Sequence, residues 1–203
     1  KRLAGPEAAL PYFVQQYVQQ HDQFILVIAK DMQQAYEIEQ TAKFFLDDAS
    51  AANIDILPDW ETLPYDAFSP HEDIISQRLK VFSELENRER GALIIPVTTL
   101  IQRLPPASFV HANSLSLKLG QHFDLARYRE GLENVGYRHV DTVYEHSEYA
   151  VRGSIMDVFP MGSDAPIRIE LFDNEVESLR YFDPDTQRST EKFTDISLLP
   201  ANE

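Results

Sequence analysis

The chain has 203 residues, 43% of them hydrophobic, which allows one large domain or two smaller ones and excludes wholesale disorder. It has no cysteine, which excludes disulfides and thiolate metal sites and favours a cytoplasmic protein. It has no apolar run of roughly 18 residues, so no membrane partner is expected. Its net charge of −15 opposes binding to a phosphate backbone, and residues 1–113 and 114–203 are both acidic.

The first half of the chain alternates predicted helices and strands. Amphipathic spacing predicts helices over 7–20, after the capping residue Asp31, and from about Asp73 to Glu86. The last of these helices is expected to bury Ile75, Leu79, Phe82 and Leu85. Continuous apolar runs predict buried strands at 24–29, 54–57 and 92–97. This order indicates an open, mostly parallel sheet with covering helices.

The second half has a different pattern, and a domain boundary is expected near residue 113. Asp124 is placed to cap a helix over 124–135, and Asp173-Asn174 predicts a tight hairpin turn. The other predicted elements are short strands, most of them alternating, at 114–119, 149–152, 154–159, 167–173, 175–182 and 196–199. This half is therefore expected to form a small α+β domain on an antiparallel sheet.

A proline-rich loop between these predicted elements carries three aromatic residues, Trp60, Tyr65 and Phe68. Such rings can stack on a nucleic-acid base or grip a protein partner. They can also fix the loop by packing against the rim of the sheet, which is the commoner use of buried aromatic side chains. Packing is the favoured interpretation, and the other two remain open.

Motifs for catalysis and for cofactor binding are missing from the sequence. The chain has no Gly-Lys pair, so it lacks the loop that cradles nucleotide phosphates. His71-Glu72-Asp73 fits a helix start, where acidic side chains complement the helix dipole, better than a metal site. No serine lies in a nucleophile motif. We therefore expect no catalytic residue, no cofactor and no metal in this chain.

The strand predicted at 167–173 separates an apolar face from a mixed one. Its two-residue period turns Arg168, Glu170 and Phe172 away from the isoleucines and the leucine that form the core. Arg152, on a nearby predicted strand, is placed to join the same outer face. Arginine beside an aromatic ring is typical of a protein-binding hot spot. The alternative is that helix 124–135 or another domain covers this face.

Much of the chain closely resembles the bacterial transcription-repair coupling factor family (Mfd), specifically its amino-terminal UvrB-homology part. The resemblance rests on PDWETLPYDAFSPHEDIISQRLK, GALIIPVTTLIQRLPP, GYRHVDTVYEHSEYAVRG and DVFPMGSDAPIRIELFDNEVESLRYFD. It implies that residues 1–113 form a degenerate RecA-like half-domain, of the P-loop NTPase type, similar to UvrB domain 1a. It also implies that residues 114–203 form a UvrA-binding α+β domain similar to UvrB domain 2.

The resemblance implies a non-catalytic role in transcription-coupled DNA repair, in which the second domain recruits UvrA to a stalled RNA polymerase. The residues carried over by motif are Arg152, Arg168 and Phe172, with Glu170 as a possible addition. ATP, Mg, DNA and RNA polymerase are partners of other domains of that family, and its carboxy-terminal domain is an intramolecular partner of this one. Two other interpretations remain open, an ATPase or helicase fragment and a DNA-binding module.

Overall fold

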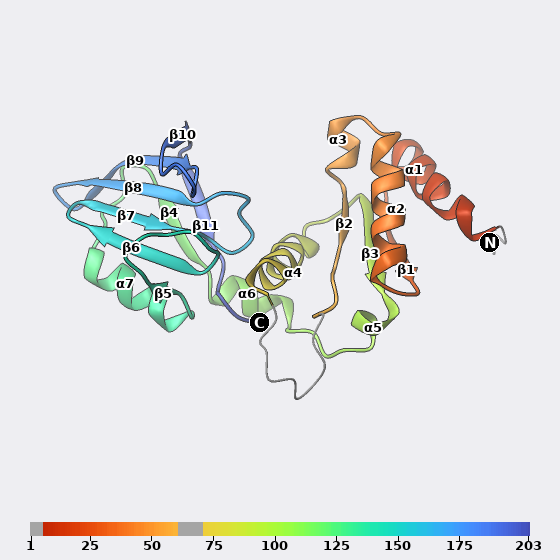
Figure 1. The fold of residues 1–203 in the computed structure, drawn as a ribbon, viewed down its shortest axis with the longest axis horizontal. Coiled ribbons are helices and arrows are strands. Elements are labelled where there is room, and N and C mark those ends of the chain that lie inside the picture. The colour runs from red at the N-terminus through yellow and green to blue at the C-terminus, as the bar shows by residue number, and fades with distance from the viewer. Residues whose placement is uncertain (1–5, 61–70) are drawn as a thin grey trace. The chain divides into compact units, whose positions relative to one another are not determined.

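The computed structural model describes residues 6–60 and 71–203 (Figure 1). These residues form two compact units, which we call unit 1 (6–60 and 84–104) and unit 2 (71–83 and 105–203). These units are defined by packing alone. The domain boundary expected near residue 113 from the change in sequence pattern stays a prediction. Tyr65 and Phe68 of the aromatic loop lie outside the described residues, and Trp60 is half-buried.

Unit 1 contains a three-stranded parallel sheet, as the alternating pattern predicted, and its strand order is β1-β3-β2. Its strands are β1 (Phe24–Ala29), β2 (Ile54–Ile56) and β3 (Gly91–Pro96). Its helical elements are η1 (Glu7–Ala9), α1 (Leu10–Gln20), α2 (Met32–Phe44), α3 (Asp48–Ala51) and α5 (Val97–Leu100). Asp31 caps α2 by accepting a hydrogen bond from the Gln34 backbone N–H at 2.8 Å.

The core of unit 1 lies between the sheet and helices α1 and α2. Its members are small and branched apolar residues from both layers: Val14, Val27, Ala29, Ala35, Ile38, Ala42, Ile54, Ile56, Ala92 and Ile94. Gly91 opens β3 with a φ of +96°, and a Cβ there would lie 2.1 Å from the Asn53 carbonyl oxygen. Only glycine therefore fits this start of the central strand.

Unit 2 is built on a six-stranded sheet in the order β10-β9-β8-β7-β6-β5. Its strands are β5 (Arg138–His139), β6 (Glu148–Arg152), β7 (Ile155–Val158), β8 (Ile167–Phe172), β9 (Glu175–Phe182) and β10 (Ser189–Lys192). All neighbours in this sheet are antiparallel except β5 and β6. Asp173 and Asn174, with φ of 47° and 63°, form the predicted hairpin turn between β8 and β9.

The rest of unit 2 consists of a second small sheet and three helices. The small sheet pairs β4 (Leu115–Lys118) with β11 (Asp195–Leu198). The helices are α4 (Glu72–Leu85, in unit 2 up to Ser83), α6 (Ala107–Ala112) and α7 (Leu125–Asn134). Asp124 caps α7 as predicted.

Helix α4 follows the predicted apolar stripe only in part. Leu79 and Phe82 are buried, as expected from their spacing, whereas Ile75 is only half-buried. Leu85 is exposed, so its predicted burial is wrong; it is the last residue of the helix, where the stripe ends. Among the described residues no helix is long and apolar enough to cross a membrane.

Candidate protein-binding site

The four residues predicted for the binding site lie on one face of the six-stranded sheet. The strand register places Asp157 between Ala150 and Arg168, and Ile155 between Arg152 and Glu170. Because side chains alternate along each strand, Ile167 and Ile169 point to the opposite face, and both are fully buried. We call the set Arg152, Asp157, Arg168, Glu170, Phe172 and Arg180 the arginine face.

Asp157 lies at the centre of the arginine face. Its side chain is 1% exposed, and both of its oxygens accept hydrogen bonds from arginines. Arg168 binds it through two atoms, Nε to Oδ1 at 2.7 Å and Nη2 to Oδ2 at 2.9 Å. Arg152 binds Oδ2 through Nη2 at 2.7 Å. This paired geometry satisfies a carboxylate that would otherwise be costly to bury.

Arg168 is less exposed to solvent than expected from its position on the outer face, since only 16% of its side chain is accessible. Besides Asp157, its Nη1 donates to the Gln187 carbonyl oxygen at 3.2 Å. Its guanidinium carbon lies 4.8 Å from the centre of the Phe182 ring, within the range of a cation–π contact. The hydrogen bonds with Asp157 raise the pKa of Arg168 further above its already high value.

Arg152 and Phe172 form the open end of the arginine face. Both residues end a strand directly before a hairpin turn, and β6 and β8 run in the same direction because each is antiparallel to β7. The Arg152 side chain is 51% exposed and Phe172 is 65% exposed. An aromatic ring and a guanidinium group are therefore exposed at the same end of these strands.

Glu170 and Arg180 add a third ion pair, with 3.5 Å between Oε2 and Nη2. Both side chains are partly exposed, so this pair is screened by water and contributes little to stability. Arg180 also donates from Nε to the Ser178 hydroxyl at 2.9 Å. The pair adds one donor group and one acceptor group to the surface that a partner would meet.

The other end of the same face is covered by apolar side chains. Val143, Ala150, Phe159 and Phe182 form a small buried cluster, with Val140 packed against it. The side-chain amide of Gln187 donates to the Val143 carbonyl oxygen at 3.2 Å, which links the two segments around the cluster. The face predicted to be exposed is thus divided into a covered end and an open end.

Sequence reasoning missed Asp157 and Arg180. Asp157 is a single charge at an alternate position of an otherwise apolar strand, which was visible in the sequence. The two-residue turn at Gly153-Ser154 pairs Arg152 with Ile155 and so places Asp157 on the face of Arg152. The alternation of the strand and the length of the turn together could therefore have predicted that Asp157 lies on this face.

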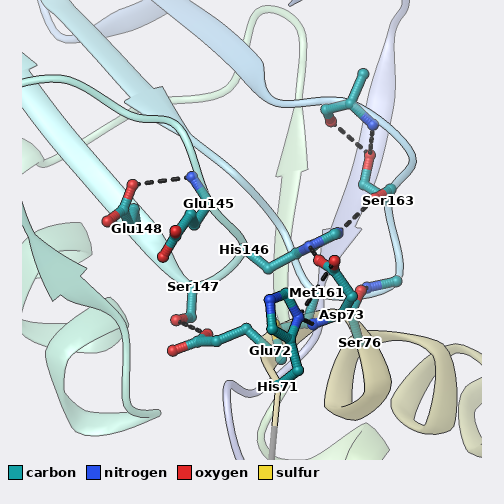
Figure 2. Close-up of polar contacts among 12 residues, drawn as sticks. His71, Glu72, Asp73, Ser76, Glu145, His146, Ser147, Glu148, Met161 and Ser163 are labelled. Atoms are coloured by element: carbon teal, nitrogen blue, oxygen red, sulfur yellow. Dashed lines mark hydrogen bonds and ion pairs between the residues drawn. The ribbon is translucent and has the colours of Figure 1, made fainter. Parts of the chain in front are cut away.

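A second polar cluster in unit 2 ties α4 to the segments around residues 138–148 and 161–164 (Figure 2). His146 contacts Asp73 Oδ1 through Nδ1 at 2.8 Å and the Ser163 carbonyl oxygen through Nε2 at 2.9 Å. The Ser147 hydroxyl donates to Glu72, and the Gly162 N–H donates to the Ser76 hydroxyl.

Arginine–carboxylate pairs extend this cluster, which we call the α4 clamp. Arg138 approaches Glu72 at 3.2 Å, and Arg78 donates to Glu203 from Nε at 2.5 Å and Nη2 at 3.1 Å. Glu72 and Asp73 lie in the first turn of α4, as predicted. Their carboxylates also contact distant residues, since Glu72 approaches Arg138 and Asp73 contacts His146. Among the described residues no group of three histidine or acidic side chains is suited to hold a metal ion.

A comparison with known protein families identifies the class of protein to which most of unit 2 belongs. A family model described as "UvrB interaction domain" matches residues 115–203, which include the whole arginine face. This part of the chain therefore matches a protein-interaction domain, and its two sheets are antiparallel except for the pair of β5 and β6.

The whole chain is homologous to the transcription-repair-coupling factors, as the sequence resemblance indicated. It is 47% identical to that factor from Escherichia coli strain K12 over 205 residues, which cover 100% of this chain and 18% of the relative. The identity is 43% for Haemophilus influenzae, over 91% of this chain and 16% of the relative. For Bacillus subtilis it is 32%, over 88% and 15%. The chain spans less than a fifth of the length of these relatives.

Proposed function

We propose that this chain is a non-catalytic recruitment module that binds UvrA through the arginine face. In this role it would bring nucleotide excision repair to a stalled RNA polymerase. The supporting observation is that the half-exposed side chain of Arg152 and the exposed ring of Phe172 end two strands of one sheet, β6 and β8, within a UvrB interaction domain. Arginine and aromatic residues supply a large share of binding energy in protein interfaces.

The charges of the arginine face favour an acidic partner surface. The whole chain carries −15, but the face contains three arginines against Asp157 and Glu170, a local charge of +1. Arg152 and the exposed part of Arg168 would form charge-assisted hydrogen bonds with carboxylates of UvrA. Phe172 would enter an apolar pocket. The acidic remainder of the chain would repel other acidic surfaces and so restrict where the partner can bind.

The test is calorimetry of UvrA with the Arg152→Ala/Arg168→Ala/Phe172→Ala variant. Each truncation is expected to cost about 1–3 kcal/mol of binding free energy, so the combined variant should lose most of its affinity. A matched control, Arg90→Ala/Arg103→Ala/Phe44→Ala, removes the same three side-chain types from exposed positions in unit 1. Unchanged affinity in the arginine-face variant, with the fold intact, would refute the proposed site.

Unit 1 has a different proposed origin, as a RecA-like half-domain that has lost its phosphate loop. The parallel sheet with helices between its strands supports this origin, as does the missing Gly-Lys pair. The chain alone is then expected to bind neither ATP nor DNA. Measurable binding of a fluorescent ATP analogue would favour the ATPase interpretation, and a salt-sensitive DNA shift would favour the DNA-binding one.

The arginine face is also proposed to dock the carboxy-terminal domain of a complete coupling factor. The same exposed side chains would then be hidden until that domain moves away. An isolated carboxy-terminal domain should compete with UvrA for this chain in calorimetry. Simultaneous binding of both would contradict a shared face.

A further inference from the structure

Asp157 is a buried carboxylate whose role goes beyond neutralising one neighbour. It lies within β7 (Ile155–Val158), and the two strands that flank β7 each send it an arginine. A buried carboxylate is tolerated in its charged form only when donors satisfy both oxygens. Arg168 binds both oxygens and Arg152 binds one of them. A single carboxylate thus organises two guanidinium groups on three adjacent strands.

The two arginines are held to different degrees. Arg168 has additional contacts with the Gln187 carbonyl oxygen and the Phe182 ring. Arg152 is followed by Gly153, where φ is +62° and an added Cβ would meet no atom within 4 Å. The Arg152 side chain is 51% exposed, so neighbouring atoms confine it less than they confine Arg168. Its guanidinium donates to Asp157 Oδ2, which connects it to the middle of β7.

We propose that Asp157 is the positioning residue of the arginine face, because it fixes the direction of the Arg152 guanidinium before a partner binds. This inference rests on the recruitment function proposed above. An arginine already held in its bound orientation loses less rotamer freedom on association. Asp157 also leaves the Arg152–Asp157–Arg168 group with a charge of +1, which suits one carboxylate of the partner. Without Asp157 two neighbouring cations would repel each other.

The first test uses the free protein and needs no partner. Nitrogen-15 relaxation of the arginine Nε–H groups is expected to show Arg152 becoming mobile in the Asp157→Asn variant. Arg180, which has its own partners in Glu170 and Ser178, should keep its order. The matched control is Asp164→Asn, which changes an exposed aspartate on the loop between β7 and β8. An Arg152 side chain that stays as ordered as in the wild type would overturn the inference.

A second variant tests the inference even if Asp157→Asn fails to fold. Asp157→Asn leaves Arg168 with a buried, poorly paired charge, whereas Asp157→Leu/Arg168→Met replaces the whole buried pair with apolar side chains, a change that proteins often tolerate. Arg152 should become mobile in this variant too, with a cooperative urea transition showing that the domain is folded. A folded double variant with an ordered Arg152 would count against the proposal.

The binding test separates this inference from the proposed function. Asp157→Asn should weaken UvrA binding about tenfold, and Arg152→Ala should cost less affinity in this background than in the wild type, because a mobile Arg152 contributes less to binding. Additive losses would overturn the positioning role. If Arg152 becomes mobile in the free variant but neither Arg152→Ala nor Phe172→Ala changes UvrA affinity, the positioning role holds and the proposed binding site fails.

Discussion

Unit 2 contains two clusters of arginines and carboxylates that differ in what surrounds them. In the α4 clamp, the Arg78 side chain is fully buried and Glu203 is 8% exposed. In the arginine face, the carboxylate is buried but Arg152 remains half in solvent and Phe172 protrudes. The clamp therefore joins segments of one chain, whereas the arginine face leaves a guanidinium group and an apolar ring exposed to solvent.

This difference leads to opposite expectations for substitutions. Removing one partner of a buried pair leaves an uncompensated charge, which lowers the free energy of unfolding. Removing an exposed anchor changes binding but leaves the fold almost untouched. The following substitutions use this contrast to test the two assignments, beginning with the largest expected effect.

Arg78→Ala is expected to lower the free energy of unfolding by about 3–5 kcal/mol, because Glu203 would remain as a buried, unpaired carboxylate. Urea denaturation measures the change. The matched control is Lys80→Ala on the same helix, where the pair with Asp164 spans 3.8 Å and is exposed. That control should change stability by less than about 1 kcal/mol. Equal effects of the two changes would mean that burial does not separate the two kinds of pair.

Phe172→Ala is expected to weaken UvrA binding by about 2 kcal/mol while the free energy of unfolding changes by less than about 0.5 kcal/mol. The reason is that the ring is mostly in solvent in the free protein. Calorimetry and urea denaturation give the two numbers. Phe44→Ala, a change of the same kind at an exposed position of unit 1, should alter neither. A large loss of stability in Phe172→Ala would show that the ring supports the fold.

Ser76→Ala is expected to cost about 1 kcal/mol of stability, because the Gly162 N–H would lose its acceptor in the α4 clamp. UvrA affinity should stay the same. Ser83→Ala is the control on the same helix, since the Ser83 hydroxyl donates only to the Lys80 carbonyl oxygen within the helix. A drop in UvrA affinity for Ser76→Ala would link the clamp to binding and weaken the contrast between the two clusters.

Asp183 begins the turn that carries Gln187, whose carbonyl oxygen accepts from Arg168. Hydrogen bonds from the backbone N–H groups of Thr186 and Asp185 hold the pKa of Asp183 below its ordinary value. The folded pKa is thus lower than the unfolded one. Its stabilising effect is present above the unfolded value and is lost as the pH falls through the folded value.

Carbon-13 NMR titration of the side-chain carboxyl should therefore show Asp183 titrating at lower pH than an unperturbed aspartate. In Asp183→Asn this pH dependence should disappear, with little effect on UvrA binding. An ordinary titration midpoint would mean that the turn is not held by this carboxylate in solution.

Local chemistry made much of the fold predictable from the sequence. The apolar run at Phe24–Ala29 and the alternating run at Glu175–Phe182 coincide with β1 and β9. The caps and the Asp173-Asn174 turn follow from short-range hydrogen bonding and backbone preference. Strand β10 (Ser189–Lys192) was missed because this edge strand is wholly exposed and lacks the apolar residues that signal a strand.

The outward direction of Arg152, Arg168, Glu170 and Phe172 also followed from the sequence, because the two-residue period of a strand is set by the backbone. Whether each of them is open to solvent was decided by packing. Arg168 lies against Phe182 and Asp157, and the segments 140–143 and 183–187 flank the covered end of the face. These contacts depend on strand order and on loops that no local pattern encodes.

The sequence by itself determined the longer elements, their caps and turns, and the relatives of this chain, because these depend on neighbouring residues and on shared descent. Only the tertiary structure decided that Asp157 joins two arginines, and that α4 is bound by partners as distant as Glu203, 125 positions from Arg78. The physical reason is that a buried charge chooses its partner by three-dimensional proximity, which the order of residues along the chain does not specify.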